Sequence, residues 1–144
     1  MKKIAIGGDH AGYDLKSELI TYLEELGYTV KDYGTYSDES TDYPDYVHPL
    51  ASAIENGEFE QGIILCGSAN GVSMTANKHQ GIRAALSWTP EIAELGRLHN
   101  NANVLAIPAR YVSNEEAKKI VDAFISTDFE GGRHQRRVDK IAMD

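Results

Sequence analysis

The sequence predicts an α/β protein, a three-layer α/β/α sandwich built on a five-stranded parallel sheet. Short runs of aliphatic and β-branched residues alternate along the chain with stretches whose apolar residues recur at helical spacing. One short run, residues 62–66, is apolar almost throughout, as is typical of a strand buried on both faces of a sheet. Strands separated by helices imply right-handed crossovers and therefore a parallel, Rossmann-like sheet.

Each element has its own signal along the chain. Apolar residues repeat at helical spacing from Leu15 to Leu26, and Gly27 follows where a helix-ending glycine is common. Ser113 is a good cap for the last long helix, which has an acidic first turn. The predicted strands are residues 4–6, 28–30, 62–66, 82–86 and 104–107. The predicted helices are residues 11–26, 49–56, 71–78 and 90–99 and one after the capping segment 113–116, and residues 33–49 are predicted to be a long loop.

Length and composition describe one domain, which we expect to span residues 1–144. A formal net charge of −8 argues against a nucleic-acid binder, but a local basic cluster can still hold a small anionic substrate. No apolar run approaches the ~20 residues of a membrane span, and the N-terminal apolar stretch is too short for a signal peptide. The single cysteine excludes an internal disulfide and fits a reducing compartment. We therefore expect a cytoplasmic protein that contacts neither membrane nor nucleic acid.

The residues that directly follow the strands are candidate ligand contacts. In open parallel sheets, ligands bind at the carboxyl ends of the strands, where the strand order reverses. These candidates are Asp9 and His10 after the first strand, residues 66–71 after the third, Ser87 and Trp88 after the fourth, and Arg110 after the fifth.

The segment from Cys66 to Gly71 places a thiol at the end of a buried strand, just before a helix. The unpaired N–H groups at a helix N-terminus favour an anion, which could be a phosphate, a transient oxyanion or a thiolate. An ordinary turn with glycines needed only for geometry is an equally good interpretation of this segment alone. It is not a P-loop, because no Gly-Lys-Ser/Thr follows, and residues 7–12 lack the glycine spacing of a dinucleotide fingerprint.

Two histidines and the basic C-terminal tail add further candidates. We expect His10, beyond the first strand, and His99, before the last strand, to lie near the ligand. A metal site that joins both to Asp9 is conceivable, but no metal-binding motif supports it, and we predict no metal. In a helical tail, Arg133 and Arg137 would share one face and could clamp a phosphate. A solvated basic terminus is the more common alternative.

Six groups of short motifs follow one another along the chain: GDHAG at 8–12, TDYP at 41–44, CGS at 66–68, ANK and GIRA at 76–78 and 81–84, HN and NVLA at 99–100 and 103–106, and EGGRH at 130–134 with Arg137. Together they resemble the ribose-5-phosphate isomerase B group, which also includes galactose- and allose-6-phosphate isomerases. The resemblance covers essentially the whole chain, in order and without large insertions.

The resemblance implies an aldose–ketose isomerase of the pentose phosphate pathway, which interconverts ribose 5-phosphate and ribulose 5-phosphate through an enediolate without metal or cofactor. It implies that Cys66 takes the C2 proton and that His99 opens the sugar ring. It also implies that Ser68 shuttles protons between the oxygens and that Asp9 positions the sugar.

The resemblance also implies a set of substrate-binding residues. The amides from Gly67 through Ala69 and Asn70 to Gly71 would form an anion hole, and Tyr43 and Asn100 would line the pocket. The phosphate would be held by His10, Arg110, Arg133, His134 and Arg137. In the family the site lies at the interface of a homodimer, or of a dimer of dimers. Residues 131–144 would then be a tail that reaches the partner subunit and supplies its basic residues.

Residues 69 and 70 depart from the pattern of the group, since many relatives have Gly at the position of Ala69 and a small apolar residue instead of Asn70. If residue 69 has a positive φ, alanine costs on the order of 1 kcal/mol there.

Alternatives to ribose 5-phosphate are allose 6-phosphate and other hexose 6-phosphates, because pocket shape sets the choice of sugar. Two other classes stay open: a sugar-phosphate-binding protein without chemistry, and a thiol hydrolase that uses Cys66 and His99.

Overall fold

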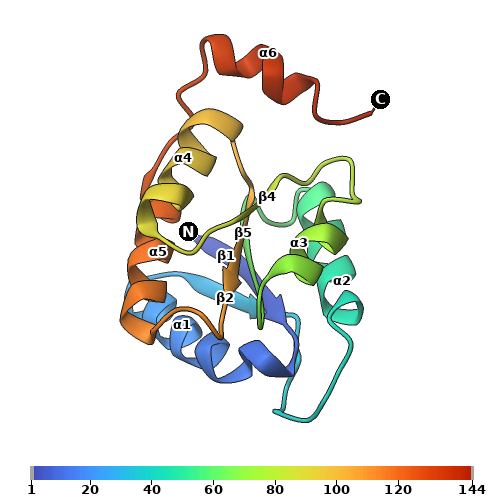
Figure 1. Cartoon of the computed structure of the whole chain (residues 1–144), viewed down its shortest axis with the longest axis vertical. Coiled ribbons are helices and arrows are strands. Elements are labelled where there is room, and N and C mark those ends of the chain that lie inside the picture. The colour runs from blue at the N-terminus through green and yellow to red at the C-terminus, as the bar shows by residue number, and fades with distance from the viewer. Residues whose placement is uncertain (1, 144) are drawn as a thin grey trace.

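The computed structural model describes residues 2–143, which form three layers of secondary structure (Figure 1). The strands are β1 (Lys3–Gly8), β2 (Thr29–Asp32), β3 (Gly62–Cys66), β4 (Ala84–Leu86) and β5 (Val104–Pro108). The helices are α1 (Tyr13–Glu25), α2 (Pro44–Glu55), α3 (Asn70–Ala76), α4 (Pro90–Asn100), α5 (Asn114–Ser126) and α6 (Arg133–Asp139), with the short 3-10 helix η1 (His10–Gly12) before α1. Met1 and Asp144, the ends of the predicted domain, lie outside the described residues.

The sheet has the strand order β2-β1-β3-β5-β4, and all four pairs of neighbouring strands are parallel. The predicted five-stranded parallel sheet is therefore confirmed. The chain moves outward from β1 to β2 and then crosses back to β3 on the other side of β1. The strand order thus reverses between β1 and β3, and the register pairs Gly8 with Leu65 at the carboxyl ends of these two strands.

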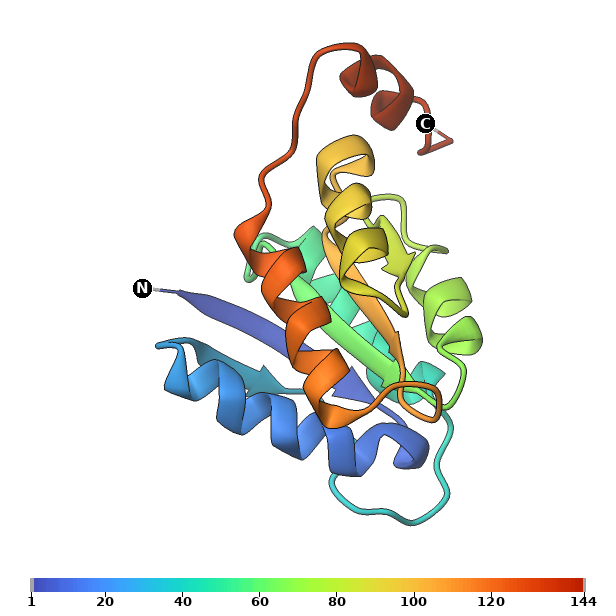
Figure 2. The same ribbon diagram turned by 60° about the vertical axis from the view of Figure 1, so that its left-hand side comes forward.

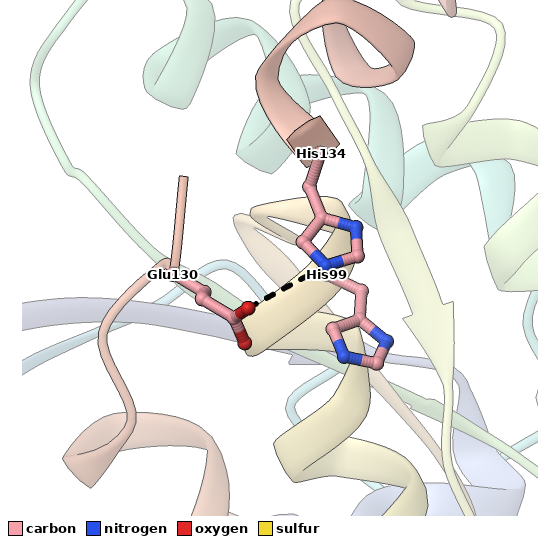
Figure 3. Close-up of side chains that lie close together, drawn as sticks. All are labelled: His99, Glu130 and His134. Carbon is pink, nitrogen blue, oxygen red and sulfur yellow. Dashed lines mark ion pairs between the residues drawn. The ribbon is translucent and has the colours of Figure 1, made fainter. Parts of the chain in front are cut away.

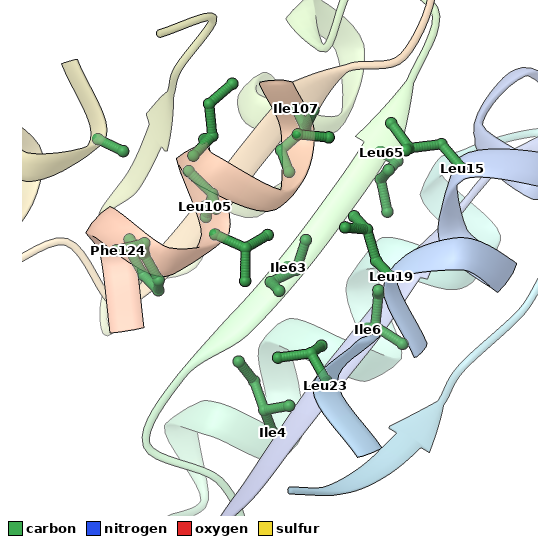
Figure 4. Packing of buried hydrophobic residues seen from close by; sticks show 14 of the residues in the cluster. Ile4, Ile6, Leu15, Leu19, Leu23, Ile63, Leu65, Leu105, Ile107 and Phe124 are labelled. Atoms are coloured by element: carbon green, nitrogen blue, oxygen red, sulfur yellow. The ribbon is translucent and has the colours of Figure 1, made fainter. Parts of the chain in front are cut away.

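Successive side chains of the central strands enter two separate cores. Ile4 and Ile6 of β1 and Ile63 of β3 pack against α1, α4 and α5 on one face, as Figure 4 shows for most of this cluster. Ala5 and Ile64 face the other way and pack against α2 and α3. In the view of Figure 2, α1 and α5 lie in front of the sheet.

The predicted loop over residues 33–49 is too long, because α2 begins at Pro44. Proline is favoured at the first helical position, where its fixed φ suits the helix and its missing N–H is not needed. Val47 and Leu50 are both fully buried at helical spacing within the same helix. Pro49 lies inside α2, so the expectation that the helix starts there is wrong.

The basic tail is helical from Arg133 to Asp139, so Arg133 and Arg137 lie one turn apart, as their spacing predicts. Residues His134 and Val138 of α6 are buried, and α6 contacts α4 (Figure 1). No helix within residues 2–143 combines the length and the apolar character that crossing a membrane requires.

Candidate functional site

A cavity of about 400 Å³ opens at the carboxyl ends of β1, β3 and β5, beside the point where the strand order reverses. Ligands of open parallel sheets bind at this place. A larger cavity of about 470 Å³ contains neither a thiol nor an imidazole. The cavity at the carboxyl ends is lined by Asp9, His10, Ala11, Tyr43, Cys66, Gly67, Ser68, Gly71, Arg110 and Tyr111.

Two glycines bring the segment after β1 directly onto the end of β3. A Cβ on Gly8 would collide with the carbonyl oxygen of Leu65, and one on Gly12 would lie 2.6 Å from the Leu65 Cβ. The Asp9 amide donates to the Leu65 carbonyl at 3.2 Å. This close approach places Asp9 next to the strand that ends in Cys66.

The side chains of Asp9 and His10 are fixed by backbone amides. Asp9 is 7% exposed, and its Oδ1 accepts a hydrogen bond from the Ala11 amide at 3.0 Å. The Thr41 amide donates to His10 Nδ1 at 3.1 Å. In a neutral His10 ring, Nε2 therefore carries the hydrogen and can donate it to a ligand.

Cys66 ends β3 and lies between the cavity and the core under α2 and α3, with 5% of its surface exposed. The Ala109 amide donates to the Cys66 carbonyl at 2.9 Å, and the Arg110 amide donates to the Gly67 carbonyl at 3.1 Å. The Arg110 guanidinium lies over Gly67, where a Cβ would approach its Nη1 to 3.1 Å. These contacts bring a thiol and a guanidinium to one wall of the cavity.

The turn between β3 and α3 contains Ala69 in the left-handed conformation, with φ 65° and ψ 2°. The sequence analysis expects a strained alanine only if residue 69 has a positive φ, and the structure shows that it does. Alanine therefore has backbone strain here that glycine would avoid. Ser68 Oγ accepts from the Asn70 amide at 3.3 Å and from Asn70 Nδ2 at 3.1 Å. The Ser68 hydroxyl hydrogen is thereby directed away from Asn70. Ala69 and Asn70 shape the turn but do not line the cavity.

The remaining predicted site residues form a second cluster. His99 is in the last turn of α4, and its ring stacks on that of His134, with centroids 4.4 Å apart and planes 17° from parallel (Figure 3). His134 Nε2 lies 3.7 Å from Glu130 Oε1 and has no hydrogen-bond partner within residues 2–143. Arg133 and Arg137 are exposed on α6 beside this cluster, and Asn100 is exposed at the end of α4.

The second cluster lies at the opposite edge of the sheet from the cavity. A residue that directly precedes a parallel strand is at the amino end of that strand, and α4 leads from the carboxyl end of β4 to the amino end of β5. In Figure 1 the end of α4 and the whole of α6 lie far from the start of α1. The expectation that His99 lies at the ligand edge of its own chain is therefore wrong. Within one chain, His99 also lies too far from Asp9 and His10 for the three to form the metal site that the sequence analysis considered.

Glu130 was not among the predicted site residues, although it begins the EGGRH motif. Across residues 2–143, His99, Glu130 and His134 are the group of three whose possible metal-ligand atoms lie within 4.8 Å of one another. However, the lone pairs of two stacked, nearly parallel imidazoles run side by side and do not converge on one ion. Arg133 adds positive charge next to them. The stacked geometry therefore does not favour a shared metal ion.

The sequence analysis does not predict Ala11 and Tyr111, which line the cavity, or Thr41, which contacts the His10 ring. Tyr111 lines the cavity, and its place directly after Arg110 was the available signal. Thr41, in the TDYP motif, fixes the His10 ring through its amide, and its own buried hydroxyl has no hydrogen-bond partner among the described residues.

Comparison with known proteins gives matches over nearly the full length. Residues 4–141 match the family model described as Ribose/Galactose Isomerase. The chain is 50% identical to ribose-5-phosphate isomerase B of Escherichia coli over 141 residues, which cover 98% of this chain and 95% of the relative. A ribose 5-phosphate isomerase structure from Thermotoga maritima superposes with a TM-score of 0.97, at 50% identity and 99% coverage of both chains. The Mycoplasma genitalium enzyme with bound ribulose 5-phosphate gives a TM-score of 0.91, at 44% identity and coverages of 96% and 93%.

Proposed function

The chain belongs to the ribose/galactose isomerase family, and on that basis we propose that it interconverts ribose 5-phosphate and ribulose 5-phosphate as an aldose–ketose isomerase. One observation carries the assignment to a reaction. A thiol, a carboxylate, an imidazole and a guanidinium meet in one cavity at the reversal point of the sheet. These groups match the needs of an enediolate reaction on a phosphorylated sugar.

Isomerisation moves one proton from C2 to C1 of the open-chain sugar. We assign its removal to the Cys66 thiolate, which leaves an enediolate and then returns the proton to C1, so that the thiolate is regenerated. The start of α3 lies directly beyond the turn at residues 67–69. The Asn70 amide, the first of the helix, donates to Ser68 Oγ. The next amide, that of Gly71 at the cavity wall, has no acceptor within the helix and favours the negative charge that develops on the sugar oxygens.

Proton movement between O1 and O2 needs a group that can both donate and accept. We propose Ser68 for this role, because its hydroxyl hydrogen is available to donate and it can accept once the exposed Asn70 side chain releases the lone pair that its Nδ2 occupies. Asp9 is held by the Ala11 amide and is available to accept hydrogen bonds from sugar hydroxyls. We propose that Tyr43 forms the opposite wall of the sugar site.

The phosphate requires cationic and neutral donors at the far end of the sugar. Arg110 offers a guanidinium in the cavity, and His10 offers an Nε2 hydrogen because the Thr41 amide occupies its Nδ1.

We propose that a second copy of the chain completes the site. His99 and Asn100 would come from the end of its α4, and Arg133, His134 and Arg137 from its α6. This division is supported by the position of the second cluster, which cannot reach the cavity of its own chain. The partner's His99 would protonate the ring oxygen and open the furanose. The functional unit would be a homodimer or a dimer of dimers that acts in the cytoplasm, in the pentose phosphate pathway.

The test measures turnover of ribose 5-phosphate against allose 6-phosphate in a coupled assay. We expect turnover of ribose 5-phosphate to dominate. We expect Cys66→Ala to lower kcat by several orders of magnitude while ribulose 5-phosphate still binds, and deuterium from solvent to enter C1 or C2 with the wild-type enzyme. No turnover of either sugar would contradict an isomerase, and unchanged kcat in Cys66→Ala would contradict the assigned base. A covalent acyl-enzyme with burst kinetics would instead indicate a thiol hydrolase.

A further inference from the structure

The exposed side chain of Asn70 is hydrogen-bonded to Ser68, the residue proposed to move protons between the sugar oxygens. Asn70 Nδ2 donates to Ser68 Oγ at 3.1 Å, and the Asn70 amide donates to the same oxygen at 3.3 Å. Ser68 lines the active-site cavity, whereas Asn70 does not. A residue outside the cavity therefore supplies two donors to a hydroxyl in its wall.

Both lone pairs of the Ser68 hydroxyl are occupied by residue 70. A serine hydroxyl has one hydrogen to donate and two lone pairs that can accept. The Asn70 amide takes one lone pair and the side-chain Nδ2 takes the other. In this arrangement Ser68 can donate its hydrogen to a sugar oxygen but has no lone pair left for a sugar hydroxyl.

The proposed isomerisation requires Ser68 to donate and to accept. While Cys66 takes the C2 proton, Ser68 passes its hydrogen to the carbonyl oxygen O1 and takes the hydrogen of the O2 hydroxyl, so it ends with the one hydrogen that it began with. One lone pair must be vacated for the O2 hydroxyl. The backbone amide of Asn70 is fixed at the start of α3, behind the fully buried Ala69. The Asn70 side chain is exposed and can rotate into water, so it is the donor that leaves.

We propose that Asn70 is a specificity-determining residue, because its side chain competes with the O2 hydroxyl of the sugar for one lone pair of Ser68. Binding of the open-chain aldose exchanges the hydrogen bond from Nδ2 for one from the O2 hydroxyl. A sugar phosphate without a hydroxyl on C2 has no donor for this exchange and leaves Asn70 in place. The inference rests on the proposed function, since it concerns the hydroxyl that is assigned to proton transfer.

Two substitutions of Asn70 should change kcat/KM for ribose 5-phosphate in opposite directions. Asn70→Ala removes the competing donor and keeps the backbone amide, so kcat/KM should rise about 2- to 10-fold, the range that one neutral hydrogen bond covers. Asn70→Asp replaces the donor with a carboxylate, which can only accept. The carboxylate takes the Ser68 hydrogen and turns it away from the sugar, so kcat/KM should fall by about 10-fold or more.

The experiment measures steady-state kinetics of both variants alone and combined with Ser68→Ala. Without the Ser68 hydroxyl, Asn70→Ala should leave kcat/KM unchanged, because nothing remains for residue 70 to occupy. Asn70→Asp should then show only the smaller loss caused by repulsion between its charge and the phosphate. Asn114→Ala is the matched control and should have wild-type kinetics. Asn114 is likewise an exposed asparagine at the first position of a helix, but the serine before it accepts from the Glu116 amide.

A ligand without the C2 hydroxyl tests the exchange directly. The inhibition constant of 2-deoxyribose 5-phosphate should be the same for wild type and Asn70→Ala, although their kcat/KM values for ribose 5-phosphate differ.

Four results would overturn the inference and leave the isomerase intact. These are a kcat/KM of Asn70→Ala that does not rise, a rise that persists in the Ser68→Ala background, wild-type activity in Asn70→Asp, and a change in the inhibition constant that equals the change in kcat/KM. No turnover by wild type would contradict the proposed function itself, and an unchanged kcat in Ser68→Ala would contradict the assigned proton shuttle, and either would remove this inference as well.

Discussion

The phenol ring of Tyr43 lies directly against the Cα of Gly71, so a side chain at residue 71 would collide with the ring. Tyr43 is the residue before α2, and Gly71 is in the first turn of α3. The contact therefore ties the starts of two helices together. It also sets one wall of the cavity that contains Cys66.

Gly71→Ala should displace the Tyr43 ring and weaken substrate binding. The colliding atoms are at the far end of a side chain that can rotate, so the backbone need not move and stability should change by less than about 1 kcal/mol. KM for ribose 5-phosphate should rise on the order of 10-fold with a smaller change in kcat. Steady-state kinetics measure this, and Met74→Ala, at an exposed position of the same helix, is the control. A wild-type KM in Gly71→Ala would show that Tyr43 does not contact the sugar.

Two inactive variants should restore each other's activity when they assemble together. A Cys66→Ala chain keeps a complete α4 and α6, and a His99→Ala chain keeps a complete cavity. In a symmetric dimer of the two, one of the two sites has both intact halves. Random assembly of equal amounts should give about one quarter of wild-type activity. The assay compares the co-refolded mixture with each variant alone, and a mixture no more active than its components would mean that each site belongs to one chain.

Removing Asp32 should cost more stability than removing its partner Lys16. Lys16 is 1% exposed, and its Nζ donates to both Asp32 oxygens at 2.7 and 2.8 Å and to the Thr35 carbonyl at 2.7 Å. Asp32→Ala leaves a buried ammonium with one carbonyl and should cost about 3–5 kcal/mol. In Lys16→Met the partly exposed Asp32 carboxylate keeps the Gly34 amide at 2.8 Å, so the loss should be smaller. Urea unfolding at pH 7 ranks the two, and the reverse order would be inconsistent with this account.

Glu55→Gln should remove a stabilising effect that is present only above acid pH. The folded state lowers the pKa of the Glu55 carboxyl, chiefly through the Gly81 amide and then through His79. Its contribution to stability is therefore fully present above the pKa of the unfolded state, about 4.3, and is lost as pH falls through the lower pKa of the folded state. The variant should have a lower urea midpoint than wild type at pH 7, and the difference should shrink toward pH 3. Glu94→Gln, at an exposed position of α4, should show no such convergence.

The sequence predicts the layers of the fold well because each depends on local periodicity. The apolar run of residues 62–66 is the central strand β3, and the helical spacing from Leu15 is α1. The sequence does not predict the start of α2, because Pro49 favours a helix start there, whereas the buried contacts of Val47 that support the earlier turn are tertiary. The order β2-β1-β3-β5-β4 also depends on contacts between distant segments, which no local pattern contains.

The candidate site was predictable in part, and the reason differs between its two halves. Asp9, Cys66 and Arg110 lie at or just beyond the carboxyl ends of three strands, so parallel topology alone brings them together. His99 is in the last turn of α4, which leads into β5, and the same rule places it at the opposite edge. The sequence alone cannot predict whether Ala69 has a positive φ, since the backbone dihedrals of a turn depend on how it closes against α3. A contribution from a neighbouring chain to the site, as proposed for His99, has no periodic pattern in the sequence of one copy.

The path of α4 also bears on how the activity should depend on protein concentration. Because this helix carries His99 away from the cavity of its own chain, a lone chain holds two incomplete sites that cannot meet. Under the shared-site proposal, specific activity should fall on dilution once subunits separate, even though every chain remains folded. A lesion in one half of the chain would disable one of the two sites of a mixed dimer and leave the other intact, so such a defective copy would not lower the total output of intact copies in the same cell.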